Sequence, residues 1–189
     1  MKTLIALLIA VLALSAAGAS TAGKTLYAFE KNTCGWWTFA NNATLKLSCD
    51  ATTGAGGSTG SLLASYQWLP GQGAYMGLGV QPKWTMAGDA WPNYAKGRFA
   101  VSFKSDALVS VRIELRASDK KTYAYTIEGI PSTWKEYAIP FDRFTCGGKG
   151  IDLNVADIDQ IVVIPQKVND DPHSLWMDNI AISTDSVKP

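Results

Sequence analysis

The sequence has 189 residues, which at roughly 100–200 residues per domain is the length of one domain with short appendages. Hydrophobic residues make up 47% of the chain and charged residues 17%, a balance that excludes intrinsic disorder over most of its length. The formal net charge of +1 excludes the broad basic surface of a nucleic-acid-binding protein and a polybasic membrane patch. One His and four Glu are a small inventory for acid–base catalysis, whereas seven Trp, seven Tyr and six Phe form a surplus of aromatic residues.

The N-terminus has the pattern of a secretory signal peptide. A single Lys precedes the apolar stretch Leu4–Leu14, and small residues follow that allow cleavage after Ala19 or Ala22. An uncleaved membrane anchor is the less favoured alternative, because a membrane span needs about 20 apolar residues. We therefore expect residues 1–22 to be a cleaved signal peptide and residues 23–189 to be one soluble, secreted domain that acts as a monomer.

If the protein is exported, its three cysteines, Cys34, Cys49 and Cys146, are candidates for disulfide formation. In an oxidising compartment two of them would pair and one would be left over. We favour a Cys34–Cys49 disulfide, because these two are close in sequence and flank a predicted strand. The alternative is that all three are buried thiols. None has a credible partner base, so no cysteine is a candidate nucleophile.

The mature chain consists of short segments rich in β-branched and aromatic residues, separated by turn residues. Within Leu108–Ala117, apolar residues alternate with charged ones, which predicts a strand with one buried and one polar face. Only Val155–Asp159 suggests a helical turn. In chain order the predicted strands are Leu26–Glu30, Trp36–Phe39, Thr44–Cys49, Ser61–Trp68, Ala74–Val80, Arg98–Lys104, Leu108–Ala117, Lys121–Glu128, Trp134–Pro140, Ile158–Pro165 and Ser174–Ser183.

This succession of short strands predicts an all-β protein, a sandwich or a barrel, and its length suits a two-sheet antiparallel jelly roll. The long stretch Gln81–Gly97 interrupts the strand rhythm and places Trp84, Trp91 and Tyr94 among turn residues. A hydrophobic core does not need aromatic residues in a polar loop, and loops carry function more often than strands do. The loop is therefore a candidate binding element.

Three motifs in order resemble the jelly-roll carbohydrate-binding modules with a galactose-binding-like fold, of the family-eleven type, and the related complex I intermediate-associated protein family. The resemblance covers residues 24–183 and implies the fold more strongly than the ligand. Such modules usually accompany a catalytic domain, and we expect none within these 189 residues. The motifs are Phe29-Glu30 followed by Gly35-Trp36, the W-x-x-Y-x-I-P-F-x-x-F pattern of Trp134–Phe144, and Asp157–Ile161 followed by Trp176–Ile180.

Aromatic rings bind sugars because the C–H face of a pyranose is apolar and weakly positive, whereas the face of the ring is negative. The resemblance implies core positions for Trp36, Trp134 and Trp176. For each Trp among the candidate platforms, core packing is the alternative, since Trp is usually mostly buried. The candidate platforms are Trp84, Trp91 and Tyr94 in the loop, Tyr123 and Tyr125 two residues apart on one strand, and Trp68.

Arg112, Glu114 and Arg116 share the polar face of one predicted strand. Guanidinium groups are planar donors that suit vicinal hydroxyls or carboxylates. The alternative is a solvated face held by mutual ion pairs of little energetic value. We expect Arg112 and Arg116 to lie beside the tyrosine strand and to contact the sugar.

The resemblance also implies a structural calcium site formed by Glu30, Asn32 and Asp178. Calcium takes six to eight oxygen ligands, and two carboxylates from opposite ends of the chain, an amide and loop carbonyls would supply them. The alternative is that these carboxylates accept hydrogen bonds from loop amides.

Three other functions are alternatives to carbohydrate binding: a polysaccharide lyase, a glycosidase, and an adhesion or assembly protein. Arg112–Arg116 also resembles the R-x-E-L-R strand of jelly-roll alginate lyases, but Gln160-Ile161-Val162 lacks the His of that family's Gln-x-His motif, and His173 follows a turn-like stretch. A glycosidase needs two facing carboxylates, which no motif supplies. An extracellular adhesion or assembly protein is the remaining alternative. We therefore expect a secreted, non-catalytic protein that binds a neutral polysaccharide, such as cellulose or another β-glucan.

Overall fold

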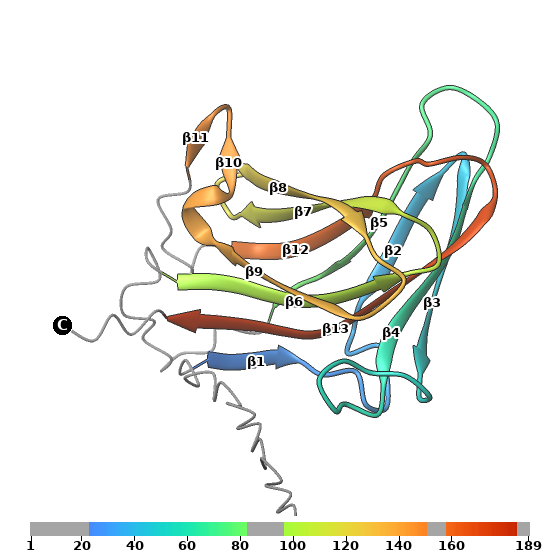
Figure 1. The fold of residues 1–189 in the computed structure, drawn as a ribbon. Coiled ribbons are helices and arrows are strands. Elements are labelled where there is room, and N and C mark those ends of the chain that lie inside the picture. The colour runs from blue at the N-terminus through green and yellow to red at the C-terminus, as the bar shows by residue number, and fades with distance from the viewer. Residues whose placement is uncertain (1–22, 83–96, 151–157, 185–189) are drawn as a thin grey trace, which may run out of the picture.

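The computed structural model describes residues 23–82, 97–150 and 158–184, which form two antiparallel β-sheets. In sheet 1, β1 pairs with the C-terminal half of β13, and β4 pairs with its N-terminal half. Figure 1 shows β1, β13 and β6 side by side. In order across the sheet, the strands of sheet 1 are β3 (Ala43–Asp50), β4 (Ser61–Trp68), β13 (Pro172–Thr184), β6 (Gly97–Ser105) and β9 (Lys135–Pro140), with β1 (Gly23–Tyr27) beside β13.

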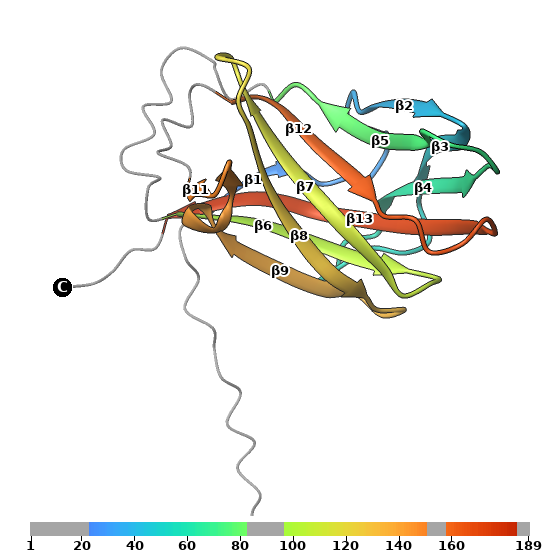
Figure 2. The same cartoon turned by 90° about the horizontal axis from the view of Figure 1, so that it is seen from above.

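Sheet 2 lies against sheet 1, and Figure 2 shows its strands β7, β8 and β12 crossing over β6 and β13. A short 3-10 helix, Phe141–Arg143, leads from β9 of sheet 1 to the small hairpin at one edge of sheet 2. In order across the sheet, the strands of sheet 2 are β2 (Trp37–Asn41), β5 (Tyr75–Val80), β12 (Ile158–Pro165), β7 (Val109–Ala117), β8 (Thr122–Ile130), β10 (Thr145–Cys146) and β11 (Lys149–Gly150).

The hydrophobic core forms where the apolar faces of the two sheets meet. Strand β7 shows why, because its alternate residues Val111, Ile113 and Leu115 are buried in the core, while Arg112 and Arg116 point the other way. The facing strands of sheet 1 bury alternate residues in the same manner. The predicted all-β, two-sheet antiparallel sandwich is therefore confirmed.

The predicted strands match the observed ones closely, because β4 and β12 have the predicted bounds and the other nine differ by a few residues at their ends. The hairpin of β10 and β11 was not predicted, since two-residue strands carry no periodic signal. The predicted helical turn at Val155–Asp159 is wrong at its end, where Ile158 and Asp159 begin β12. Its first residues and the proposed signal peptide, residues 1–22, lie outside the described residues.

Two of the three tryptophans expected in the core are placed elsewhere. Trp36 is in the core and 6% exposed, but Trp134 and Trp176 are half-buried and do not belong to the core cluster. Trp176 projects from the outer face of sheet 1, where it pairs with Lys104 of β6. The Lys104 ammonium lies 4.4 Å from the Trp176 ring centroid and 5.8 Å from that of Trp134. A surface cation–π cluster therefore replaces the expected core packing.

All three cysteines are free thiols, so the expected Cys34–Cys49 disulfide is absent. The Cys34 thiol lies 3.7 Å from the carbonyl of Asn32, and the Cys49 thiol donates to the carbonyl of Phe29 at 2.9 Å. Burial raises the pKa of both thiols, and nearby carboxylates add to this at Cys49. All three thiols are only partly buried, which is less than the alternative of buried thiols requires.

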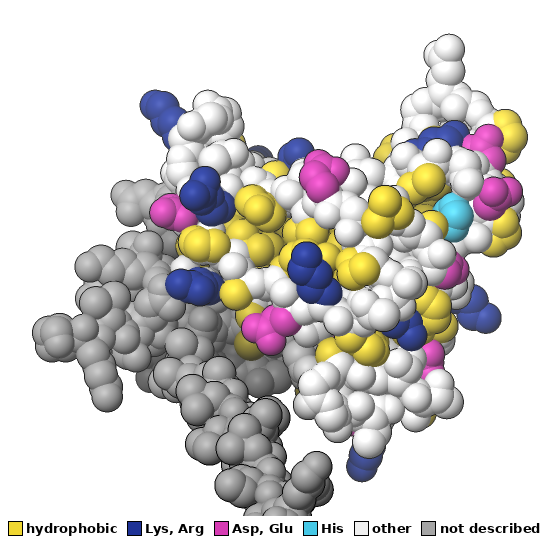
Figure 3. Space-filling model, viewed as in Figure 1, with side chains coloured by type: hydrophobic (Ala, Val, Ile, Leu, Met, Phe, Trp, Pro, Cys, Tyr) yellow, Lys and Arg dark blue, Asp and Glu magenta, His cyan; other side chains and the backbone are white. Residues whose placement is uncertain are grey.

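No helix in the described ranges is long and apolar enough to cross a membrane. On the face of the molecule seen in Figure 3, Lys and Arg side chains lie singly among hydrophobic and acidic ones. This face carries no extended patch of one charge, in keeping with the nearly neutral composition.

Candidate functional site

The outer face of sheet 2, the face turned away from the core, gathers aromatic and charged side chains on neighbouring strands. Paired residues in an antiparallel sheet point to the same side, so the register fixes which residues share this face. One row of paired residues crosses it from Ala124 of β8 through Glu114, Val162 and Gly79 to Trp37 of β2. At about 4.8 Å per strand, Glu114 and Trp37 are about 14 Å apart across the sheet.

Three aromatic rings line the β2 edge of this face, and we call Trp37, Phe39 and Tyr75 the aromatic row. The Trp37 and Phe39 ring centroids are 5.8 Å apart, and those of Phe39 and Tyr75 are 6.3 Å apart. Trp37 is 37% exposed and Tyr75 is 56% exposed. Large aromatic side chains are usually buried, so a row of three with two exposed members is a candidate binding surface.

Two glycines of β5 let the aromatic row lie close to the sheet. A Cβ atom at Gly79 would lie 2.7 Å from Cζ2 of Trp37, and one at Gly77 would lie 2.5 Å from Cζ of Phe39. Both contacts are shorter than van der Waals distance, so any side chain at these positions would lift the rings. Because Gly77 and Gly79 carry no side chain, the rings of Phe39 and Trp37 lie directly over the backbone of β5.

An ion-pair triad occupies the β7 side of the same face. Glu114 accepts a hydrogen bond from Nε of Arg112 at 2.9 Å, and from Nε and Nη2 of Arg116 at 3.0 and 2.8 Å. The Glu114 side chain is 9% exposed, whereas those of Arg112 and Arg116 are 44% and 35% exposed. The buried carboxylate thus fixes two partly exposed guanidinium groups, whose outward N–H groups can donate to ligand oxygens.

The two tyrosines expected beside these arginines lie on the other side of the sheet. Tyr123 pairs with Leu115 and Tyr125 with Ile113, so both tyrosines point toward the core. Both are partly buried against the core, and the ring centroids of Tyr125 and Phe144 are 5.9 Å apart. The expectation that Tyr123 and Tyr125 form the floor of a site with Arg112 and Arg116 is therefore wrong.

The remaining candidate platforms lie elsewhere or cannot be placed. Trp68 is 5% exposed and belongs to the core cluster, so its ring presents no open face to a sugar. Trp84, Trp91 and Tyr94 lie outside the described residues, and their predicted role stays a prediction. The aromatic row was missed because Trp36–Phe39 was considered only as a strand. The available signal was the alternation of Trp37 and Phe39 together with the Gly77-Leu78-Gly79 pattern of another strand.

Glu30, one of the three expected calcium ligands, instead holds the loop of residues 51–60. Its carboxylate accepts hydrogen bonds from the Ser58 hydroxyl at 2.8 Å, from the Thr59 N–H at 3.2 Å, and from the Thr59 hydroxyl. These bonds hold the pKa of Glu30 below its ordinary value, because they stabilise the ionised form.

Asp178, the second expected ligand, holds the same loop from the opposite end of the chain. It is fully buried, and its Oδ2 accepts the Ala55 N–H at 2.9 Å while its Oδ1 accepts the following residue's N–H at 2.7 Å. The third expected ligand, Asn32, accepts the N–H of Cys34 at 2.7 Å within its own turn. All three side chains thus face hydrogen-bond donors.

Hydrogen bonds from the loop engage the side chains that the calcium prediction names, and that prediction stays a prediction. No group of three His, Cys, Asp or Glu side chains in the described ranges is placed to hold a metal. The N–H and O–H groups around Glu30 and Asp178 use some of the carboxylate lone pairs, which leaves fewer of them for an ion. The arrangement matches the alternative of carboxylates bonded to loop amides.

We expect a chelator such as EDTA to leave the melting temperature unchanged, because the loop is held by hydrogen bonds from Glu30 and Asp178. Thermal unfolding with and without EDTA, followed by readdition of calcium, checks this. A fall in melting temperature that added calcium reverses would support a bound ion, since a ligand of the native state stabilises it by mass action.

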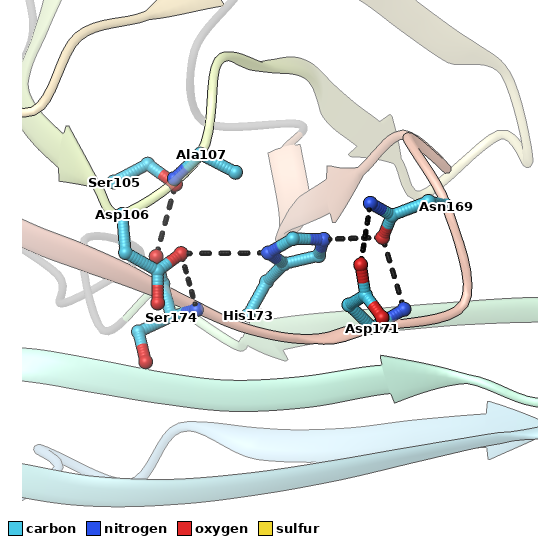
Figure 4. A network of polar contacts seen from close by, with 7 residues as sticks. All are labelled: Ser105, Asp106, Ala107, Asn169, Asp171, His173 and Ser174. Carbon is cyan, nitrogen blue, oxygen red and sulfur yellow. Dashed lines mark hydrogen bonds and ion pairs between the residues drawn. The ribbon is translucent and has the colours of Figure 1, made fainter.

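The only histidine of the chain lies in a separate polar network, shown in Figure 4. Nε2 of His173 lies 2.7 Å from Oδ1 of Asn169, and Nδ1 lies 3.7 Å from Oδ1 of Asp106. Oδ1 of Asn169 also accepts the N–H of Asp171 at 2.9 Å. This oxygen is therefore an acceptor, and Nε2 of His173 carries the proton. His173 is the second residue of β13 and its side chain is 11% exposed, so it links the connection before β13 to the connection after β6.

The positions of His173 and Val162 bear on the lyase alternative. His173 belongs to sheet 1, whereas Arg112 and Arg116 project from the outer face of sheet 2, so these groups do not face one substrate. Val162 stands where the lyase motif requires His, and it is fully buried opposite Glu114. In the described part of the chain, the arginine face therefore has no histidine base.

Comparison with solved structures defines the class of fold. The chain superposes on a family 11 carbohydrate-binding module of the cellulosomal cellulase Lic26A-Cel5E of Clostridium thermocellum with a TM-score of 0.63 and 18% identity, over 88% of this chain and 96% of that one. A family 30 module of cellulase Cel9D-Cel44B from the same organism gives 0.62 and 12%, over 87% and 98%. An exo-β-agarase gives 0.62 and 16%, over 85% of this chain but 25% of the agarase.

The resemblance expected from the three sequence motifs is thus confirmed at the level of the fold, which is the jelly roll of family 11 and family 30 carbohydrate-binding modules. No protein-family model matches the sequence, and no curated protein matches it.

Proposed function

We propose that the protein is a secreted, non-catalytic carbohydrate-binding protein that takes a neutral polysaccharide on the outer face of sheet 2. The observation that carries this proposal is the aromatic row of Trp37, Phe39 and Tyr75. Two of its rings, Trp37 and Phe39, lie directly over Gly79 and Gly77. Stacking a pyranose on such rings removes apolar surface of both partners from water. The row replaces the tyrosine strand as the platform on sheet 2, and Trp84, Trp91 and Tyr94 of the loop stay candidates.

The charges on the face support a neutral ligand over an acidic one. The Glu114 carboxylate engages both guanidinium groups, so part of their positive charge is already compensated. The free N–H groups of Arg112 and Arg116 then act as hydrogen-bond donors to hydroxyl oxygens. Gln160, which pairs with Arg116, adds a neutral amide to the same face.

A β-glucan is the ligand class that we propose. One family 11 module of the same fold was solved in complex with a β-1,3-1,4-mixed-linked tetrasaccharide. A flat β-linked chain presents the apolar faces of successive rings, which suits a row of side chains about as long as strand β2. We propose that the protein binds such a chain as a monomer.

Affinity electrophoresis against a panel of polysaccharides tests the proposal. We expect retardation by mixed-linkage β-glucan or soluble cellulose derivatives without charge, and none by alginate. Retardation by alginate, with an increase in absorbance from unsaturated uronates, would favour the lyase alternative. A blank panel, together with a co-purifying extracellular protein, would favour the adhesion alternative.

A further inference from the structure

A concave feature lies at the Trp37 end of the aromatic row. It is a cavity of about 630 Å³ between β1, the connection from β1 to β2, and the end of β5. This volume is within the range of about 300–1,000 Å³ that is typical of small-ligand pockets. The described residues that line it include Thr25, Tyr27, Asn32, Cys34, Trp37 and Gln81, and none of those that line it is charged.

The lining combines aromatic surface with neutral hydrogen-bonding groups. Trp37 and Tyr27 offer apolar ring surface, and burial raises the pKa of Tyr27 to about 12, which keeps its hydroxyl protonated at neutral pH. Asn32 and Gln81 contribute side-chain amides, which donate and accept hydrogen bonds without charge. A neutral sugar ring, with apolar C–H faces and a rim of hydroxyls, matches this chemistry, whereas a phosphate or a uronate would find no cation among the described lining residues.

The cavity is continuous with the aromatic row, because Trp37 belongs to both. Strand β2 is the edge strand of sheet 2, and Trp37 is its first residue. A glycan chain that lies along Tyr75, Phe39 and Trp37 therefore reaches the cavity where the row ends. Beyond Trp37 the connection between β1 and β2, which contains Asn32 and Cys34, forms part of the cavity wall.

We propose that this cavity is an end subsite, which takes the terminal sugar unit of the neutral polysaccharide chain bound on the aromatic row. The proposal rests on the proposed function and adds that the protein recognises chain ends. Potency per unit mass then rises as a glucan is cut into shorter chains, because each cut creates new ends while the total number of internal units hardly changes.

The first test fills the cavity with Thr25→Trp. Thr25 is an exposed residue of the edge-pairing strand β1, where a bulky aromatic is compatible with a strand. Thr133→Trp, the same change at an exposed threonine outside the cavity and the outer face, is the matched control. Competition by mixed-linkage β-glucan, intact and cut to tetrasaccharides, is measured at equal mass for the wild type and both variants.

We expect the tetrasaccharides to compete about tenfold or more better than intact glucan with the wild type and with Thr133→Trp. With Thr25→Trp this advantage should disappear, while binding of intact glucan to the aromatic row persists. Equal potency of cut and intact glucan with the wild type, or an unchanged advantage in a folded Thr25→Trp, would overturn the end subsite and leave the proposed function standing. Failure of every form to bind any glucan would overturn both.

Alkylation of cysteine gives a second readout that does not depend on a variant. Cys34 lines the cavity, whereas Cys146 in β10 lies outside it. Reduced protein is treated with N-ethylmaleimide with and without saturating tetrasaccharide, and the rate at each cysteine is followed by peptide mass spectrometry. We expect about fivefold or greater slowing at Cys34 and none at Cys146. Equal rates at Cys34 under saturating ligand would place the sugar outside the cavity.

Discussion

Replacing Trp37 by alanine is expected to weaken polysaccharide binding by about tenfold or more and to leave the protein folded. A ring that loses its exposed apolar surface to a sugar contributes about 1–3 kcal/mol, and 1.4 kcal/mol corresponds to a factor of ten in affinity. Trp37 stands on an edge strand and points away from the core, so its removal opens no core cavity. Affinity electrophoresis and thermal unfolding of the same preparation measure both effects.

Phe39→Ala is the matched comparison, because Phe39 is on the same strand and face but less exposed than Trp37. It should weaken binding less than Trp37→Ala. If Trp37→Ala keeps full affinity at a native melting temperature, the aromatic row is not the platform. The search would then return to Trp84, Trp91 and Tyr94.

Replacing Trp36, the residue immediately before Trp37, should have the opposite result. Trp36 is 6% exposed and packs edge-to-face on Tyr27 and Phe29, with ring centroids 5.9 and 6.2 Å away. Truncating a buried tryptophan to alanine costs about 3–5 kcal/mol, since it leaves a cavity in the core. We expect Trp36→Ala to lower the free energy of unfolding by this amount in urea denaturation.

The comparison of the two neighbours is informative because each serves as the control of the other. Glycan affinity of the folded fraction of Trp36→Ala, measured at low temperature, should remain within a few-fold of the wild type. Loss of binding in well-folded Trp36→Ala, or a stability loss below about 1 kcal/mol, would contradict the core assignment.

The fold could be predicted from the sequence because its signals are local. The alternation in β7, the turn residues between segments and the ordered motifs each follow from a few neighbouring residues. The reliance on local motifs also explains why the core positions predicted for two tryptophans are wrong. Trp134 and Trp176 were placed in the core by resemblance, but their indole N–H groups donate to Thr53 and Asp50, which pulls the rings toward a surface loop.

The candidate site was harder to predict because it depends on pairing between distant strands. Tyr123 and Tyr125 share a face, as expected, but their spacing of two residues does not by itself determine which face of the sheet that is. Ile127, two residues further on, has the same parity and is buried, so the signal for the core side was present. By contrast, the exposure of Trp37 depends on Gly79, about forty positions away, and no local pattern connects them.

The glycines of β5 also separate two properties that most surfaces combine. The identity of the Trp37 and Phe39 rings is encoded in β2, whereas the height at which these two rings lie above the sheet is encoded in Gly77 and Gly79 of β5. A mutation in β5 can therefore reshape the binding surface without changing any residue that touches the ligand. Such a surface can diversify through two nearly independent segments of the chain. Changes in β2 alter which side chains the surface presents, and changes at the glycines of β5 alter its shape.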